Sequence, residues 1–250
     1  MEKLETIILA KKKYREYDEL VWFFTEEYGL ISAIVRGVKK KTNPYRGQLT
    51  LFSFVTMDVI VKTGLSIITA FENQGYHTKD SQSMLNIFIY GSQISELIQR
   101  VLPEKEKVSG LFNMLVFFVE KLDKLSSPNI AVLFFQQRLL FYTGVQVNLA
   151  FCSICHEKND IIAFSNYYHG LLCLKCKAEV GMYDITDIWK LKVLVAFSQI
   201  TLEKIEGLIL DEQEEAFLTA FWDEIYLETL GISLKSKKVG KSLKEMEQKK

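Results

Sequence analysis

The sequence predicts an α+β protein. We expect a small five-stranded antiparallel β-barrel or sandwich at the N-terminus, followed by an all-α domain that carries a four-cysteine zinc knuckle. Three observations lead to this fold class. The first 75 residues contain five short β-prone runs joined mostly by turns. From about residue 81, apolar residues recur at helical spacing. All four cysteines stand in one short segment, residues 152–176, as two C-x2-C pairs.

The five expected strands are ETIILAKKK, LVWFFTEEYG, LISAIVRGV, residues 50–62 and LSIITAFENQ, in that order. The run 50–62 alternates and is rich in Val, Phe and Thr, which is typical of a half-buried strand. One connection is longer, residues 39–47, with Pro44 and Gly47 as breakers.

The helical part begins with a stripe formed by Met84, Leu85, Phe88 and Ile89, which continues until Pro103. Further helices are expected over residues 111–122, 128–144, 188–206 and 212–230. Ser127 and Pro128 suit the start of the helix over 128–144. We interpret the apolar stripes as core packing that needs no cofactor; they include Phe117, Phe118, Phe134 and Phe135.

These patterns predict three regions. Residues 1–78 form the β module. Residues 79–230 form the helical domain, with the cysteine-rich insert at 150–180. Residues 231–250 form a basic tail that we expect to be frayed and partly disordered.

The charge is unevenly distributed along the 250 residues, although the formal net charge is zero. Residues 1–46 carry 10 Lys and Arg against 7 Asp and Glu, whereas residues 231–250 carry 7 against 2. The middle, residues 47–230, carries 14 against 22. Basic ends on an acidic body predict that a polyanion would meet the ends.

The N-terminal segment argues against export. Glu2 and Glu5 stand where a secretory signal would be basic, and no small-residue cleavage site follows. The longest apolar runs are also too short to cross a bilayer. We therefore expect a cytoplasmic protein with reduced thiols and no membrane contact.

The cysteine pairs have the spacing of a zinc ribbon or knuckle. Zn²⁺ prefers a tetrahedron of thiolates, and two residues between cysteines allow one turn to present both sulfurs. We therefore expect one structural zinc ion. The candidate ligands are Cys152, Cys155, Cys173 and Cys176. Alternatives are unmetallated thiols or a redox pair, and a catalytic zinc, which four thiolates would leave without a position for water. His156 and His169 stand close by and could replace a cysteine, but we expect them to lie at the surface or behind the ligands.

Two basic clusters are candidates for contact with nucleic acid. A cationic groove can follow phosphates while aromatic rings stack on unpaired bases, as in five-stranded barrels of the OB type. The candidate DNA-binding residues are Arg36, Lys39, Lys40, Lys41, Tyr45, Arg46, Lys11, Lys12, Lys13 and Arg15. The alternatives are ordinary solvated lysines or another polyanion.

No catalytic constellation is recognisable in the sequence. The GKS at residues 240–242 lacks the first glycine of a phosphate loop, because position 235 is Lys235. There is also no G-x-G-x-x-G, H-E-x-x-H or G-x-S-x-G motif. We therefore expect no enzyme, and a protein that binds, anneals or recruits.

Taken in order, these segments resemble the bacterial recombination mediator RecO family. YREYDELVWFFTEEYGL, residues 14–30, is similar to the family's opening strand, acidic turn and Gly-Leu. RGVKK, residues 36–40, is similar to its basic loop, and RLL with Gly144 to its helix before the knuckle. HGLLC, residues 169–173, resembles the family's second knuckle half, although His169 replaces a usual glycine. LGISLKSK, residues 230–237, resembles its C-terminal motif.

The resemblance implies an N-terminal OB fold and a helical domain with a zinc knuckle. It implies a bacterial, nucleoid-associated protein of DNA repair and recombination that binds single- and double-stranded DNA and anneals complementary strands. The implied partners are RecR, the C-terminal tail of the single-strand-binding protein and, indirectly, the recombinase RecA. Arg36, Lys39 and Lys40 are the residues that match the family's basic loop. The other candidates are added by charge alone.

A rival interpretation is a helical interaction hub that recruits repair partners without touching DNA. A hydrophobic groove beside a lysine in the helical domain could hold an acidic peptide with an apolar end. Titration with single-stranded oligonucleotide distinguishes the two, since a pure hub would not bind.

Overall fold

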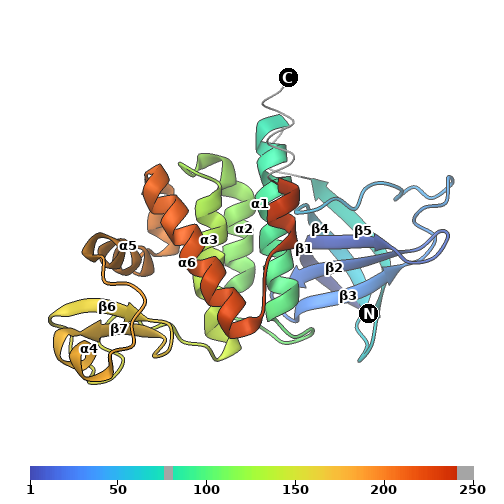
Figure 1. Ribbon diagram of the computed structural model, residues 1–250. Helices are drawn as coiled ribbons and strands as arrows, with labels where there is room; N and C mark the ends of the chain where they lie inside the picture. Colours follow the sequence, from blue (N-terminus) through green and yellow to red (C-terminus); the bar gives the residue numbers. More distant parts are fainter. Residues whose placement is uncertain (76–80, 241–250) are drawn as a thin grey trace. The chain divides into compact units, whose positions relative to one another are not determined.

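The computed structural model describes residues 1–75 and 81–240 (Figure 1). They form two compact units. The first contains Met1–Lys124 and the segment from Leu234 onward, and the second contains Leu125–Ser233. The predicted domain boundaries after residues 78 and 230 stay predictions. The part of the predicted tail beyond Gly240 lies outside the described residues.

The N-terminal strands close into a barrel, which confirms the predicted α+β fold class. The strands are β1 (Glu2–Lys13), β2 (Glu19–Thr25), β3 (Gly29–Val35), β4 (Phe54–Ile60) and β5 (Ser66–Gly75). They pair in the order β1-β2-β3-β5-β4, with β4 returning to β1. Neighbours in the barrel are antiparallel except β3 and β5, which pair in parallel over three positions. This is the five-stranded arrangement of an OB-type barrel.

Alternating side chains of these strands fill the barrel. Ile8, Phe23, Ile31 and Met57 are all buried and belong to one apolar cluster. The predicted strand at 50–62 begins only at Phe54. The backbone just before it turns at Phe52, whose φ is +58°, so the regular strand begins only after this turn.

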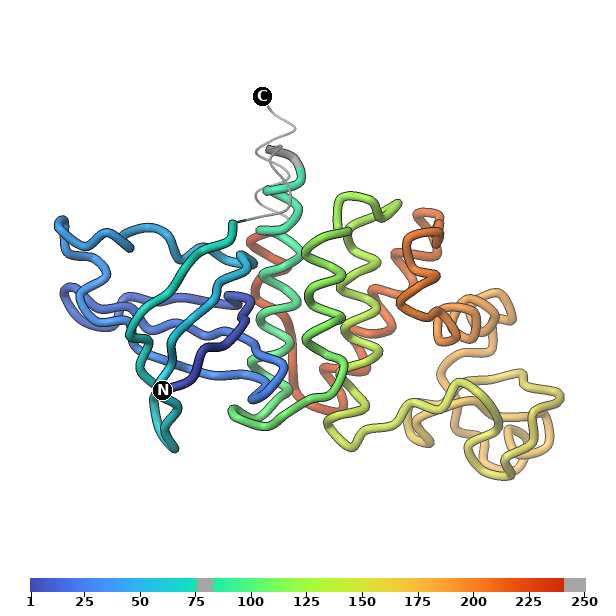
Figure 2. Tube along the Cα trace, turned by 180° about the vertical axis from the view of Figure 1, so that it is seen from behind, coloured from blue at the N-terminus to red at the C-terminus, as the bar shows by residue number. Residues whose placement is uncertain are grey.

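Helix α1 (Ser81–Val101) lies beside the barrel in both views (Figures 1 and 2). The ring of Phe52 contacts Gly91 so closely that a Cβ there would lie 2.8 Å from Cε2. One turn later, the hydroxyl of Ser95 donates a 2.5 Å hydrogen bond to the carbonyl of Leu9 in β1. Helix α2 (Leu111–Lys121) follows, and its last residues continue into a 3₁₀ turn, Leu122–Lys124.

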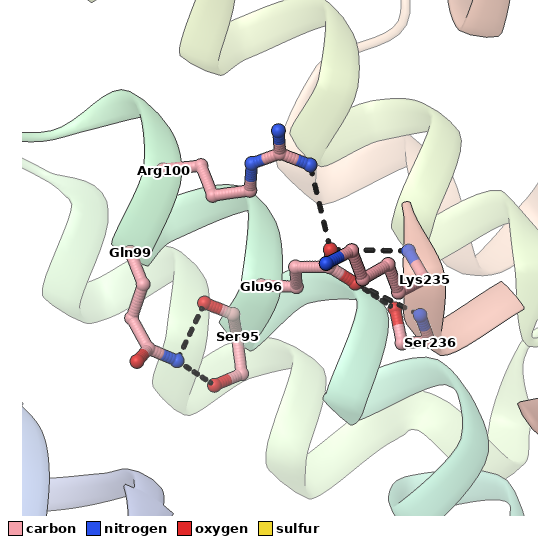
Figure 3. Close-up of polar contacts among 6 residues, drawn as sticks. All are labelled: Ser95, Glu96, Gln99, Arg100, Lys235 and Ser236. Atoms are coloured by element: carbon pink, nitrogen blue, oxygen red, sulfur yellow. Dashed lines mark hydrogen bonds and ion pairs between the residues drawn. The ribbon is translucent and has the colours of Figure 1, made fainter. Parts of the chain in front are cut away.

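The chain returns to the first unit as a short helix, residues 235–240, which lies along α1 (Figure 2). The carboxylate of Glu96 accepts hydrogen bonds from the backbone N–H groups of Lys235 (3.1 Å) and Ser236 (2.9 Å) (Figure 3). It also accepts one from the Ser236 hydroxyl (2.6 Å). At the other end, Gly240 approaches Ile89 so closely that a Cβ would lie 2.8 Å from its Cγ2. Both ends of this short helix are therefore held by α1.

The second unit is built on two long helices, α3 (Asn129–Leu140) and α6 (Glu212–Leu230). The hydroxyl of Tyr226 in α6 donates a 2.8 Å hydrogen bond to the carbonyl of Gln136 in α3. The side-chain amide of Gln136 in turn donates to Asp223 at 3.0 Å. Helix α6 begins with a capping box, in which Asp211 and Glu214 exchange hydrogen bonds.

Between these helices in the chain come a small hairpin and two shorter helices. The hairpin is formed by β6 (Ile161–Ser165) and β7 (Gly170–Cys173) and lies between the two cysteine pairs in the chain. Helix α4 (Leu174–Val180) follows directly, and α5 (Ile188–Ser198) comes next.

The prediction of one helix over residues 188–206 is wrong. Helix α5 ends at Ser198, and a separate 3₁₀ helix covers Leu202–Gly207. Side chains of α3 satisfy the carbonyls at the break: Gln137 donates to Ser198 at 3.1 Å, and Arg138 donates to Ile200 at 2.7 Å. The predicted helix over 128–144 also ends earlier, because residues 141–143 form a 3₁₀ turn before Gly144.

None of the described helices combines the length and the apolar character that crossing a bilayer requires.

Candidate nucleic-acid interface and metal centre

The two basic clusters lie at the same end of the barrel. In the antiparallel ladder Lys13 at the end of β1 faces Glu19 at the start of β2, and Glu19 faces Val35 at the end of β3. The turn 14–18 and the loop 36–47 therefore leave neighbouring strands side by side. We call these two segments, with Lys11–Lys13, the basic rim.

Two lysines of the loop are in contact with the turn. The Lys39 ammonium lies 3.3 Å from the carboxylate of Glu19, and the Lys39 N–H donates to the carbonyl of Tyr17 at 3.0 Å. The Lys40 ammonium lies 6.0 Å from the centre of the Tyr17 ring. The loop is thus joined to the turn through Tyr17 and Glu19, which are not candidate DNA-binding residues, and Lys39 has an acidic partner.

Short polar contacts hold the loop in place. Asp18 in the turn accepts a 2.8 Å hydrogen bond from the N–H of Gly37, whose φ is +65°. The Asn43 amide donates to the Gly37 carbonyl at 3.0 Å, and its oxygen accepts from the N–H of Tyr45 at 2.8 Å. Sequence reasoning missed Asp18 and Asn43 as positioning residues, although Asn before Pro is a known turn signal.

The other candidates differ in what they contact. The Lys11 ammonium donates a 2.6 Å hydrogen bond to the carbonyl of Leu49, and Arg15 lies over the ring of Tyr14 at 5.4 Å. Tyr45 is half-buried and packs on Phe71, with ring centroids 4.7 Å apart. Its ring therefore belongs to the edge of the barrel core. The remaining cations are exposed: Lys12, Lys13, Arg36, Lys41 and Arg46.

The four cysteines of the chain converge on one point. Their sulfur atoms all lie within 4.8 Å of one another, and the Cys155 and Cys173 sulfurs are 3.6 Å apart. A tetrahedral ion with bonds of about 2.3 Å requires sulfurs roughly 3.8 Å apart, which these positions approach. The donor set therefore fits a thiolate-binding metal ion. In the described part of the chain, this group includes neither His156 nor His169.

The hairpin and α4 place these sulfurs. Cys173 ends β7 and is the N-cap of α4, where its sulfur accepts from the N–H of Cys176 at 3.5 Å. The first pair is placed by a tight turn, in which the His156 N–H donates to the Cys152 carbonyl at 2.9 Å. Cys152, Cys173 and Cys176 are buried with Ala163 and Leu172 in a small apolar cluster.

The cysteines differ in their tendency to ionise. Burial raises the pKa of Cys152, but backbone N–H groups of Cys155, Cys173 and Ile154 outweigh it and lower the pKa to about 6. Burial, with the neighbouring thiols, raises the pKa of Cys176 to about 12. A metal ion must therefore displace protons, so its affinity should fall as the pH falls.

Asn148 and Gly170 fasten the two halves of the knuckle to each other. Asn148 exchanges backbone hydrogen bonds with the strand: its N–H donates to the His169 carbonyl at 2.8 Å, and its carbonyl accepts from Leu171 at 3.0 Å. A Cβ at Gly170 would lie 2.6 Å from the Asn148 carbonyl oxygen and would also collide with the hydroxyl of Ser153. His169 has a φ of +47°, a conformation that glycine adopts more easily.

A cavity of about 890 Å³ opens in the second unit. Its lining includes Arg138, Phe141, Tyr142, His156 and Trp222. Arg138 lies 4.9 Å from the ring centre of Phe134. The cavity thus combines aromatic walls with a positive charge.

The comparisons with known proteins agree along the chain. A family model described as "Recombination protein O N terminal" matches residues 1–74, and one described as "Recombination protein O C terminal" matches residues 82–238. A curated "DNA repair protein RecO" from Enterococcus faecalis is 27% identical over 96% of this chain and 92% of its own length. Proteins of that name from Listeria welshimeri and Streptococcus pyogenes are 25% and 26% identical, over 95% and 92% of this chain and 93% and 91% of their own lengths.

Proposed function

The chain belongs to the recombination protein O (RecO) family of DNA repair proteins, and from this premise we propose that its barrel binds single- and double-stranded DNA and anneals complementary strands. The observation that carries the proposal is the convergence of the two basic clusters into the basic rim. The Lys39 N–H donates to the Tyr17 carbonyl, and Lys40 lies over the Tyr17 ring, so the loop and the turn are in contact at one end of the barrel.

Annealing needs no bond chemistry, so the proposal includes no catalysis. Two strands repel each other because both are polyanions, and a cationic surface lowers that repulsion. The base pairs that then form supply the driving force. Arg36 and Lys40 are exposed, and we assign them direct contact with phosphates. Lys39 is paired with Glu19, so it would contribute to DNA binding only by exchanging that partner for a phosphate.

We further propose that the cysteines hold one Zn²⁺ ion with a structural role. The support is the donor set, because four thiolates complete the tetrahedral shell that zinc prefers and leave no position for a reacting water. The four residues that would hold it belong to the second unit, whereas the basic rim belongs to the first. The metal would therefore stabilise the fold of the knuckle.

We also propose that the chain works with RecR and the single-strand-binding protein, and through them assists loading of RecA, as a mediator in the bacterial cytoplasm. The cavity of the second unit favours an acidic peptide with an apolar end, such as the tail of the single-strand-binding protein. Arg138 would meet the carboxylates and the aromatic walls would take the apolar side chain. This interaction role is the second candidate function and is compatible with the first.

The triple variant R36A/K39A/K40A tests the DNA-binding assignment. We expect weaker binding of single-stranded and duplex oligonucleotides and slower annealing, with or without single-strand-binding protein. For single strands, the slope of log affinity against log salt should become shallower by about 1.4 if the contacts of Arg36 and Lys40 are lost, and by about 2 if Lys39 also exchanges Glu19 for a phosphate in the wild type. Equilibrium titration at several salt concentrations measures both quantities.

A matched control replaces three exposed lysines of the second unit, K158A/K175A/K204A. It lowers the net charge equally and should leave the salt slope unchanged. We call R36A/K39A/K40A the rim variant. If it binds DNA as tightly as the wild type, the assignment is refuted. A wild-type protein that binds no oligonucleotide at low salt, yet binds its protein partners, would favour the interaction hub.

A further inference from the structure

Two apolar side chains of α1 face outward although they continue the stripe that packs on the barrel. Phe88 is 46% exposed and Met84 is 45% exposed. Further along the helix, Gly91 contacts Phe52, and Ser95 bonds to Leu9. The later part of the stripe is therefore in contact with the barrel, whereas Met84 and Phe88 in its first turns stay about half exposed.

These side chains form one wall of a groove of about 270 Å³. Met84, Ile87 and Phe88 of α1 line it on one side, and Lys11, Thr50 and Leu51 of the barrel line it on the other. A second hollow of about 490 Å³ continues from it, since Lys11 and Leu51 line both. Polar side chains of α1 also line the second hollow, namely Ser92, Ser95, Glu96, Gln99 and Arg100.

The groove is continuous with the basic rim. Lys11 belongs to the rim and is also part of the groove wall, and Lys12 and Lys13 follow it as exposed residues at the end of β1. An ammonium group has three donors, and the bond to the Leu49 carbonyl uses one of them. Lys11 can therefore meet a phosphate at the edge of the groove without leaving its place.

An exposed aromatic ring and a thioether beside a line of cations are the elements that unpaired nucleobases require. The π-face of a base stacks on the ring, and the adjoining phosphates are neutralised by lysine. A protein partner could also use an apolar groove, but the continuity with the rim favours a polyanion. A duplex could reach the lysines, but its paired and stacked bases could not lie on the ring.

We propose that Phe88, supported by Met84, is a stacking platform for bases of a single strand whose phosphates are held by Lys11–Lys13. The proposal rests on the proposed DNA binding and deepens it. In this proposal, the first turns of α1 give the protein its preference for single strands, and the basic rim gives it affinity for DNA of either kind. It also adds Phe88 and Met84 to the binding residues, although their helical spacing alone indicates a place in the core.

The test replaces Phe88 by alanine and measures binding to a single-stranded oligonucleotide and to a duplex at several salt concentrations. Loss of one stacked base should weaken single-strand affinity about 5- to 150-fold. The salt slope should stay the same because no phosphate contact is lost. Duplex affinity should also stay the same. Phe88→Tyr should retain wild-type binding, because it keeps the ring.

Two controls keep the test specific. Tyr167→Ala removes another exposed ring, 68% exposed in the hairpin of the second unit, and should change nothing. The thermal midpoint of the Phe88→Ala variant should match that of the wild type, because an exposed ring adds little to the core.

Unchanged single-strand affinity in Phe88→Ala, with weakened binding in the rim variant, would overturn the platform and leave the proposed function intact. Equal losses for single strand and duplex would also overturn it. Normal DNA binding combined with loss of a protein partner would assign the groove to that partner instead. If the rim variant itself binds DNA normally, the proposed function fails regardless of Phe88.

Discussion

At the residue scale, the space around a single residue decides whether the two halves of the knuckle can pack together. Gly170 lies where β7 passes the segment before the first cysteine pair, and a methyl group there would meet the carbonyl oxygen of Asn148 and the hydroxyl of Ser153. That carbonyl already accepts a hydrogen bond from Leu171, so it cannot move without breaking the connection. The position therefore requires glycine for space.

We expect Gly170→Ala to destabilise the second unit by about 1–3 kcal/mol, the usual cost of forcing an extra methyl group into a packed site. Denaturant unfolding measures the loss, and metal content should fall with it. Gly207→Ala is the matched control, because a Cβ at Gly207 meets no atom within 4 Å and its φ is not positive. Equal stabilities for the two variants would contradict the packing argument.

At the scale of elements, one carboxylate fixes the C-terminal helix to α1. Burial raises the pKa of Glu96, but hydrogen bonds from Ser236 and Lys235 and the charge of Arg100 outweigh it, so the pKa is lowered. The Arg100 guanidinium lies 3.5 Å from the carboxylate. Negative charge at a helix N-terminus is favourable, because the first N–H groups have no partner within the helix.

We expect Glu96→Gln to loosen residues 235–240. The pKa of Glu96 in the folded protein lies below the ordinary glutamate value. The carboxylate therefore holds the helix at full strength above the ordinary pKa, and this stabilisation is lost as the pH falls through the folded pKa. Hydrogen exchange of these amides, corrected for the intrinsic rate, should show this pH dependence in the wild type and a smaller one in Glu96→Gln.

Glu72→Gln is the control for this effect, since Glu72 is an exposed acid of β5 in the same unit. It should exchange like the wild type at residues 235–240. Identical protection of these residues in the wild type and in Glu96→Gln would show that apolar contacts such as Gly240 with Ile89 suffice to hold the helix.

At the scale of the whole molecule, the two proposed sites belong to different compact units. The cysteines lie within Leu125–Ser233, and the basic rim lies within Met1–Lys124. A structural ion contributes directly to the stability of the unit that holds it, because its preformed site exists only in the folded chain.

We therefore expect about one zinc per chain by elemental analysis, because four thiolates complete the shell of a single ion, and a lower unfolding midpoint after chelation. Each kcal/mol lost lowers the midpoint by roughly 4 °C in a unit of this size. Oligonucleotide affinity, measured below the new midpoint, should be unchanged. Absence of metal from protein prepared without chelator would refute the zinc proposal, and loss of DNA binding on chelation would refute the division of roles.

Local patterns in the sequence were enough to predict most elements and the chemistry of the cysteine cluster. Strand alternation and helical spacing depend on local geometry, so they predicted the five strands and most helices. The C-x2-C spacing predicted four convergent sulfurs, which the structure brings within 4.8 Å of one another. The order of the motifs also indicated the RecO family, which the family models confirm.

Only the tertiary structure shows which residues each apolar or charged side chain contacts. Periodicity marks Phe88 as part of a stripe, but in the folded chain it lines a groove and stays half exposed. Tyr45 stands in a basic loop, yet it packs on Phe71. The break after Ser198 depends on Gln137 and Arg138, which stand 61 and 62 residues from their partners in the chain. Such outcomes depend on contacts between distant segments, and local spacing carries no information about them.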